Sequence, residues 1–135
     1  MASSGQQKQH HDLGKRLEQL KVLVTQIEQE IEDLRKEGEL APPSCWIVRY
    51  LSRGRGGTYW YYKWQSSEPI FMTKKGKSSS HKYIGKAGSP AFLKAVEMVA
   101  RRSQIEGLQQ ALHTLELGLL DLVEEATRAK QKSSR

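Results

Sequence analysis

Five aromatic rings lie within six consecutive positions near the middle of the sequence. The stretch GTYWYYKW, residues 57 to 64, holds half of the ten aromatic residues in the chain: Tyr59, Trp60, Tyr61, Tyr62 and Trp64. A half-buried strand carries apolar groups on one face and polar groups on the other, whereas here rings fall on both faces. Aromatic rings on an open strand face can lie in a groove of duplex DNA or stack on unpaired bases.

Strand alternation divides these rings into two sets. Trp60, Tyr62 and Trp64 share one face, and Tyr59, Tyr61 and Lys63 share the other. One face must pack on the helix that follows the strands, and the second face is either open to a ligand or covered by a partner subunit. Because a lysine favours water, we expect the face of Tyr59, Tyr61 and Lys63 to make the contact.

The basic residues are concentrated in the same region. The whole chain carries 22 Lys and Arg against 15 Asp and Glu. Residues 45 to 102 hold twelve of the basic side chains and two acidic ones, a net +10, whereas residues 1 to 44 have a net −2 and residues 103 to 135 a net −1. A region with this charge repels itself unless an anion neutralises it, which favours a nucleic acid; an acidic protein, a lipid surface, or no dedicated partner are the alternatives.

Two glycine-containing loops add cations to this region. RGRGG, residues 53 to 57, places two arginines where glycines allow close approach to phosphates, although an ordinary hairpin turn explains the glycines equally well. KKGKSSSHK, residues 74 to 82, lacks the spacing of a P-loop and is either a phosphate-binding loop or a mobile one. The case for a polyanion ligand requires that Arg53, Arg55, Lys63 and Lys82 gather on one side of the sheet and are not paired with acidic groups of a neighbouring subunit.

The complete set of predicted nucleic-acid contacts combines these strands and loops. Its members are Arg49, Arg53, Arg55, Tyr59, Tyr61, Lys63, Lys74, Lys75, Lys77, His81, Lys82, Tyr83 and Lys86.

No catalytic or metal-binding pattern accompanies these residues. The four histidines and the single cysteine, Cys45, have no ligand spacing, so we expect no metal, no cofactor and no enzymatic activity. There is no apolar run long enough for a membrane span and no secretory signal in the first fifteen residues. We therefore expect a cytoplasmic, nucleoid-associated location.

Two heptad seams enclose the basic region. From Leu13 to Leu34 the apolar residues are spaced 4, 3, 4, 3, 4, 3, and from Ile105 to Ala129 the spacing is 3, 4, 3, 4, 3, 4, 3. Asp12 is the predicted N-cap of the first helix, and Ser89 with Pro90 the start of the second. A polar break at residues 101 to 104 indicates a change of phase within the second helix.

The two seams can pair within one chain or between chains. Pairing within the chain gives an antiparallel stalk with the basic region as a head, and pairing between chains gives a dimer or a four-helix assembly. Five apolar residues fall outside both seams: Leu23, Leu40, Leu117, Leu120 and Val123. Because a two-helix stalk leaves them uncovered, we expect a homodimer or higher oligomer through the helices.

The region between the seams alternates as β-structure. Strands are expected at CWIVRYL, TYWYYKW, IFMT and HKYIGK, three or four of them in one antiparallel arrangement. The prediction is an α+β protein with disordered tails at 1–11 and 130–135, helices at 12–38 and 89–129, and a β-sheet head at 45–88.

The order GTYWYYKW, a Lys/Gly turn, KYIGK and SPAFLKAVEMVARR resembles the arm-binding modules of tyrosine recombinases from phages and mobile elements. It is also similar to short prokaryotic proteins with a YYY-x-W … YIGK core. The resemblance covers residues 57 to 104 and implies a three-stranded sheet lying in the DNA major groove, with Tyr59, Tyr61, Lys63, His81, Lys82 and Tyr83 facing DNA. Since no catalytic domain follows, it implies a binding module in a mobile-element regulator or accessory factor, not a recombinase.

Together these patterns predict a non-enzymatic protein that binds double-stranded DNA. The alternatives are an RNA or single-strand binder that uses aromatic stacking, and a coiled-coil adaptor that recruits a protein partner.

Overall fold

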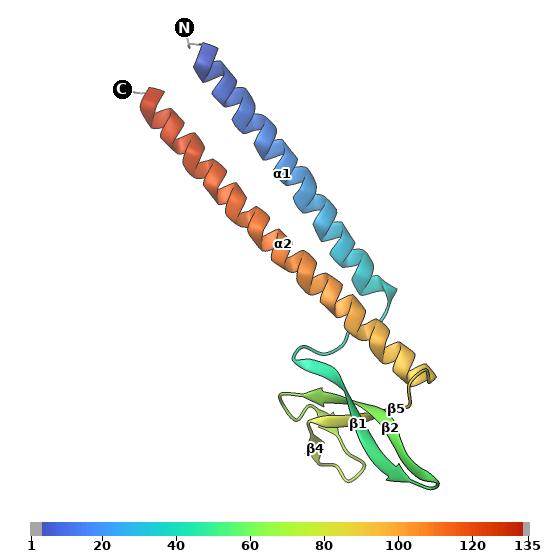
Figure 1. Ribbon diagram of the computed structural model, residues 1–135. Coiled ribbons are helices and arrows are strands. Elements are labelled where there is room, and N and C mark those ends of the chain that lie inside the picture. Colours follow the sequence, from blue (N-terminus) through green and yellow to red (C-terminus); the bar gives the residue numbers. More distant parts are fainter. Residues whose placement is uncertain (1–3, 134–135) are drawn as a thin grey trace. The chain divides into compact units, whose positions relative to one another are not determined.

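The computed structural model describes residues 4–133 and shows an α+β protein in which two long helices flank a small antiparallel sheet in sequence (Figure 1). This confirms the predicted fold class. The elements are α1 (Ser4–Glu37), β1 (Cys45–Gly54), β2 (Gly57–Ser66), β3 (Phe71–Met72), β4 (Ser78–Ser79), β5 (His81–Gly85) and α2 (Pro90–Ser133). The described chain forms two compact units, a sheet unit of residues 37–104 and a helical unit that joins residues 4–36 to 105–133.

Both helices extend further than the sequence predicted. Helix α1 begins at Ser4, so residues 4–11 are helical instead of forming a tail, and α2 continues through residues 130–133. The glutamines and lysines in these stretches are good helix formers, and neither stretch contains a proline. Asp12 lies inside α1 and pairs with Arg16 one turn later at 2.9 Å, so it is not an N-cap. The remaining tail residues, 1–3 and 134–135, lie outside the described part.

The start of α2 follows the prediction. The backbone N–H of Phe92 donates to Ser89 Oγ at 3.2 Å, and Pro90 is the first helical residue. Ser89 therefore supplies the N-cap that its position before Pro90 indicated.

In the helical unit, α1 and α2 run side by side in opposite directions (Figure 1). Arg16 donates to the Glu125 carboxylate, and Leu20 lies 3.6 Å from where a Cβ on Gly118 would be. The two seams thus pair within one chain. Only Ile27, Ile31 and Ile105 are buried among the described seam residues.

The sheet unit contains two small sheets. Strands β1, β2 and β5 form an antiparallel sheet in the order β1-β2-β5, and β3 pairs with β4 in a separate two-stranded sheet. Strands β1 and β2 pair along their whole length, from Cys45 opposite Ser66 to Gly54 opposite Gly57. Strand β5 reaches only residues 62–65 of β2, so residues 50–61 project beyond it as a two-stranded ribbon with Arg49 at its base. We call this ribbon, with Arg49, the hairpin arm.

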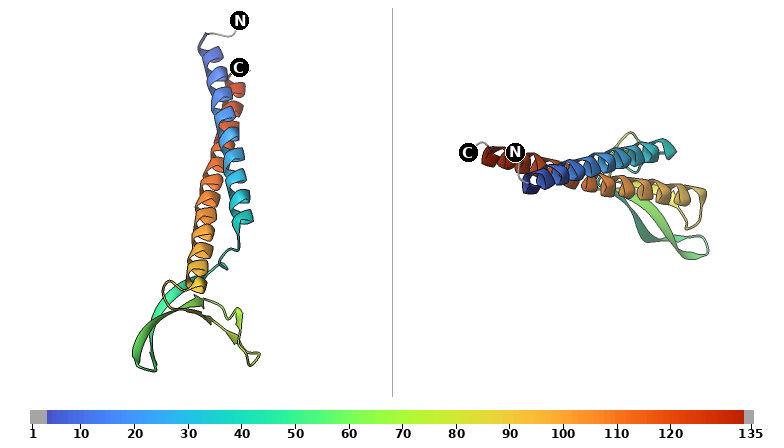
Figure 2. Two further views of the ribbon diagram at one scale, coloured as in Figure 1. Left: turned by 90° about the vertical axis from the view of Figure 1, so that its right-hand side faces the viewer. Right: turned by 90° about the horizontal axis from the view of Figure 1, so that it is seen from above.

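The first turns of α2 cover one face of the three-stranded sheet. The buried cluster between them consists of Ala41, Cys45, Trp64, Ile84 and Ala95. Partly buried side chains pack against this cluster, among them Tyr62, Phe92 and Met98. We call this side of the sheet the helix face. In Figure 2 (left) the hairpin arm and the β3–β4 hairpin both curve away from the first turns of α2, and no helix of the described sheet unit lies over the opposite face.

Two arginines fasten the connection between α1 and β1 to α2. Arg101 donates through Nε and a terminal nitrogen to the Glu39 carbonyl at 3.1 and 2.9 Å. Arg102 donates to the carbonyls of Pro42 and Cys45, both at 2.5 Å. The polar break in the seam is therefore the place where α2 binds the connecting segment, and the helix itself is continuous.

Candidate nucleic-acid interface

Four tyrosines gather on the sheet face that lies opposite the helix face. Tyr50 lies across from Tyr61, and Tyr83 lies across from Lys63, so these side chains share one side. The ring centroids of Tyr50 and Tyr61 are 6.1 Å apart, as are those of Tyr61 and Tyr83. With Tyr59 two residues before Tyr61, they form a surface across all three strands, which we call the tyrosine face.

Two lysines lie over these rings. Lys63 Nζ is 4.9 Å from the centre of the Tyr50 ring, and Lys86 Nζ is 4.8 Å from that of Tyr59 and 5.8 Å from that of Tyr61. Lys86 follows β5 and so brings a cation to the hairpin arm, beyond the end of the third strand. A cation–π contact at an exposed site is worth only about 0.5–1 kcal/mol, so a phosphate can draw either ammonium group away from its ring.

The opposite side of the hairpin arm also carries exposed groups. Leu51 pairs with Trp60, and these side chains are 52% and 47% exposed because α2 does not extend this far along the arm. The Arg49 guanidinium lies 4.0 Å from the centre of the Trp60 ring, and Arg53 lies two residues further toward the tip. The back of the arm is thus basic and partly apolar.

The loop cations lie at the two hairpin tips. Arg55 and Gly56 form the two-residue connection between β1 and β2, where Gly56 has a φ of 86° that favours glycine. Lys74, Lys75 and Lys77 lie in the turn between β3 and β4, which is closed by a hydrogen bond from Thr73 N to Lys77 O at 2.8 Å. This loop is therefore an ordered hairpin in the structure.

The register contradicts one part of the expected site. His81, Lys82 and Tyr83 are consecutive on β5, so they cannot all face one way. His81 and Tyr83 lie on the tyrosine face, whereas Lys82 pairs with Trp64 and lies on the helix face. Arg49 and Arg53 also belong to the helix-face side of the sheet. The requirement that Arg53, Arg55, Lys63 and Lys82 gather on one side is not met, because strand alternation separates Lys63 from Arg53 and Lys82.

The cations on the strands and hairpin tips of the sheet unit nevertheless have no acidic partner within the described residues. Within residues 4–133, no ion pair involves any of the following: Arg49, Arg53, Arg55, Lys63, Lys74, Lys75, Lys77, Lys82 and Lys86. Among the described residues, Lys94 on the neighbouring helix α2 forms an ion pair at 3.5 Å with Glu39 in the segment between α1 and β1. The surplus positive charge on the strands and tips is therefore open to an external anion.

Cys45 is buried in the core and does not lie on the tyrosine face. Its side chain is 1% exposed in the core cluster. Burial raises the pKa of the Cys45 thiol, and the nearby positive charge of Arg102 offsets part of that rise. A thiol with a raised pKa is a poor nucleophile at neutral pH. Within the described residues, no three His, Cys, Asp or Glu side chains are grouped to hold a metal.

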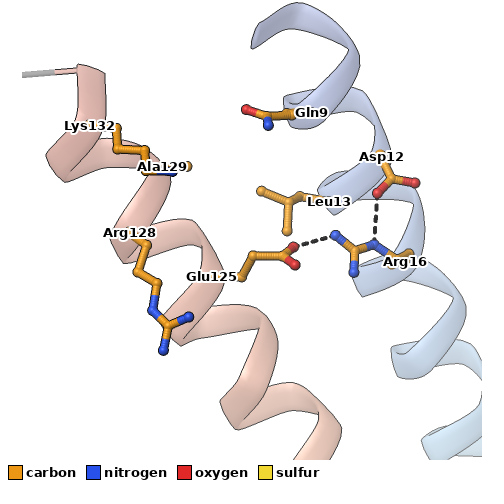
Figure 3. A pocket seen from close by; sticks show the side chains of 8 residues that line it. All are labelled: Gln9, Asp12, Leu13, Arg16, Glu125, Arg128, Ala129 and Lys132. Atoms are coloured by element: carbon orange, nitrogen blue, oxygen red, sulfur yellow. Dashed lines mark hydrogen bonds and ion pairs between the residues drawn. The ribbon is translucent and has the colours of Figure 1, made fainter. Parts of the chain in front are cut away.

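A hollow of about 360 Å³ in the helical unit is lined by charged side chains from both helices, most of them in ion pairs (Figure 3). Arg16 pairs with Asp12 and Glu125, and the hydrogen bond to Glu125 raises the pKa of Arg16 above its ordinary value. Arg128 on its rim pairs with Glu124. Of these contacts, the one between Arg16 and Glu125 joins α1 to α2, whereas the other two lie within single helices.

Among residues 4–133, neither helix has the length of apolar sequence that crossing a bilayer requires.

Comparison with protein-family models, with curated proteins and with solved structures finds no match to this chain.

Proposed function

We propose that this protein binds double-stranded DNA through the tyrosine face and the tips of its two hairpins. The observation that carries the proposal is the tyrosine face itself, where four tyrosines and two lysines lie on a sheet face that no helix covers. The major groove of B-DNA, about 12 Å wide, admits a two-stranded β-ribbon. The hairpin arm has this form because β5 ends before it.

The division of cations between two faces suits a ribbon inside a groove better than a flat surface. With the tyrosine face toward the base edges, Arg49 and Arg53 extend from the back of the arm, where long side chains can reach the phosphates that border the groove. Arg55 at one tip and the three lysines at the other add charge at the ends of the sheet. The mechanism is binding by neutralisation of phosphates and release of counterions.

A gel-shift series with duplex DNA, single-stranded DNA and RNA of the same sequence tests this proposal. We expect the duplex to bind best, with an affinity that falls on the order of 10³-fold between 50 and 200 mM salt if six or more phosphates are contacted. Equal and weak binding of all three, with little dependence on salt, would refute the proposal.

Single-stranded nucleic acid is the second candidate, and the tyrosine ladder is the observation that favours it. The exposed rings of the tyrosine face, Tyr59 on β2 and Tyr83 on β5, the latter 61% exposed, can each stack on an unpaired base, an interaction worth about 1–3 kcal/mol per base. Preference for the single strand over the duplex in the same series would select this alternative.

A role as regulator or accessory factor of a mobile element rests on the resemblance to recombinase arm-binding modules, and a nucleoid location follows from DNA binding. We propose the first on that resemblance alone and the second as a consequence of the proposed DNA binding.

A further inference from the structure

The helical unit has an apolar hollow beside a glycine. The hollow has a volume of about 160 Å³ and is lined by Leu13, Gly14, Leu17, Leu122, Val123 and Ala126. This volume is close to the ~150 Å³ of an apolar cavity that holds a benzene-sized group. A Cβ built on Gly14 would meet no atom within 4 Å, so the floor of the hollow is open because this residue has no side chain.

An apolar side chain projects next to this hollow. Leu120 is 66% exposed, the most exposed leucine among the large apolar side chains of the described chain. It precedes Val123 by three residues, and residues three apart lie on the same side of a helix. Val123 lines the hollow, so a projecting leucine and an apolar hollow share one surface of the same unit. Such a surface is complementary to itself, as a twofold interface requires.

The rest of the helical unit is suited to meeting its own copy. Residues 1–36 hold six basic and six acidic side chains, and residues 105–135 hold four and five, so two units have almost no net charge to separate them. Two helices alone leave the seam incompletely covered, since among its described positions only Ile27, Ile31 and Ile105 are buried. Four helices can bury such seams in a common core.

We propose that a second copy of this chain docks on the helical unit, with Leu120 of each copy seated in the hollow over Gly14 of the other. This interface is independent of nucleic acid. It also gives a reason for a glycine in the interior of α1, where glycine is an unfavourable helix former, because any side chain at position 14 would occupy the space that the partner leucine needs.

The test compares Gly14→Leu with Gly107→Leu by sedimentation equilibrium without nucleic acid. Both glycines are helical and have no atom within 4 Å of a built Cβ, so both substitutions raise helix propensity, but Gly107 does not line the hollow. We expect the wild type and Gly107→Leu to have twice the 15.4 kDa chain mass, and Gly14→Leu to dissociate at least about tenfold more readily. Helicity by circular dichroism should be equal or higher in both variants.

Leu120→Ala removes the projecting side chain and should weaken the dimer to a similar extent. The double variant Gly14→Leu with Leu120→Ala transfers the leucine from one side of the contact to the other, and we expect it to regain part of the lost affinity. A monomeric wild type overturns the proposal. So does a dimer that Gly14→Leu and Leu120→Ala leave unchanged, which would place a second copy or another partner on a different surface.

Discussion

Two adjacent tyrosines on β2 allow the proposed DNA binding to be tested separately from folding. Tyr61 lies on the tyrosine face, whereas its neighbour Tyr62 packs on Phe92 with ring centroids 4.7 Å apart in an edge-on arrangement. Adjacent residues of the same type thus point to opposite sides of one strand, which makes them a matched pair for mutation.

Tyr61→Ala should weaken duplex binding by roughly tenfold, about 1.4 kcal/mol, and leave the urea midpoint nearly unchanged. Tyr62→Ala should instead lower the unfolding free energy by about 2–4 kcal/mol, because it removes a ring that packs against the core. Fluorescence anisotropy and urea denaturation measure the two effects. If Tyr61→Ala unfolds the protein, its ring belongs to the core and the tyrosine face is not a binding surface.

Cys45 makes stability depend on alkaline pH. Burial raises the pKa of its thiol in the folded state above the ordinary 9.0. A group whose folded pKa is raised stabilises the fold fully below the unfolded pKa, and this contribution is lost as pH rises from about 9 through the folded value. The wild type should therefore lose more stability than Cys45→Ala between about pH 8 and pH 10, since alanine has no proton to lose. Parallel losses in urea denaturation at the two pH values would show that the thiol is not protected.

The hairpin arm carries the arginines that we propose to contact phosphates. Arg53→Ala combined with Arg55→Ala should weaken binding to every duplex sequence and reduce the slope of log affinity against log salt by about 1.8, since each lost phosphate contact accounts for about 0.9. Lys94→Ala is the control, because Lys94 lies on α2 and pairs with Glu39. An unchanged slope in the double variant would place the tip outside the interface.

The tip of the same element depends on glycine geometry. Gly56 has a φ of 86°, and a Cβ there would lie 3.0 Å from Tyr59 Oη. Gly56→Val should therefore strain the turn and move Tyr59, lowering both the unfolding temperature and duplex affinity. Gly76→Val, at a φ of 78° in the β3–β4 turn with no atom within 4 Å, is a control for stability alone, since it adds backbone strain without a clash. Unchanged duplex affinity in Gly56→Val would show that the position of Tyr59 has no part in binding.

At the scale of the whole molecule, the two units can be disabled separately. Leu112→Asp puts a charge in the seam of the helical unit, which should cost several kcal/mol, lower the helicity and reduce the mass of any dimer. Tryptophan fluorescence of the sheet unit should change little, because Trp46, Trp60 and Trp64 all lie on its strands. Unchanged helicity and mass would mean that the seam does not hold the unit together.

Much of this organisation follows from local sequence signals. Heptad spacing located both helices, Ser89 and Pro90 marked the start of α2, and strand alternation placed Tyr61 with Lys63 and Tyr62 with Trp64 on opposite faces. These signals depend on residues close together in the chain, so they can be recognised in the sequence alone. The helical extensions at residues 4–11 and 130–133 were missed because they depend on weak propensities that carry no seam pattern.

Other features depended on contacts between distant residues. The register between β2 and β5 pairs Lys82 with Trp64 and so places Lys82 on the face opposite Lys63. The same register ends β5 before the hairpin arm. Three further contacts join segments far apart in the chain. Tyr50 packs beside Tyr61, Lys86 lies over Tyr59, and Arg102 donates hydrogen bonds to the carbonyls of Pro42 and Cys45. Sequence by itself determined the kinds of elements and the side of each strand on which a residue falls, because both depend on backbone periodicity. Only the tertiary structure decided which residues meet across strands, because register is set by how several segments pack at once.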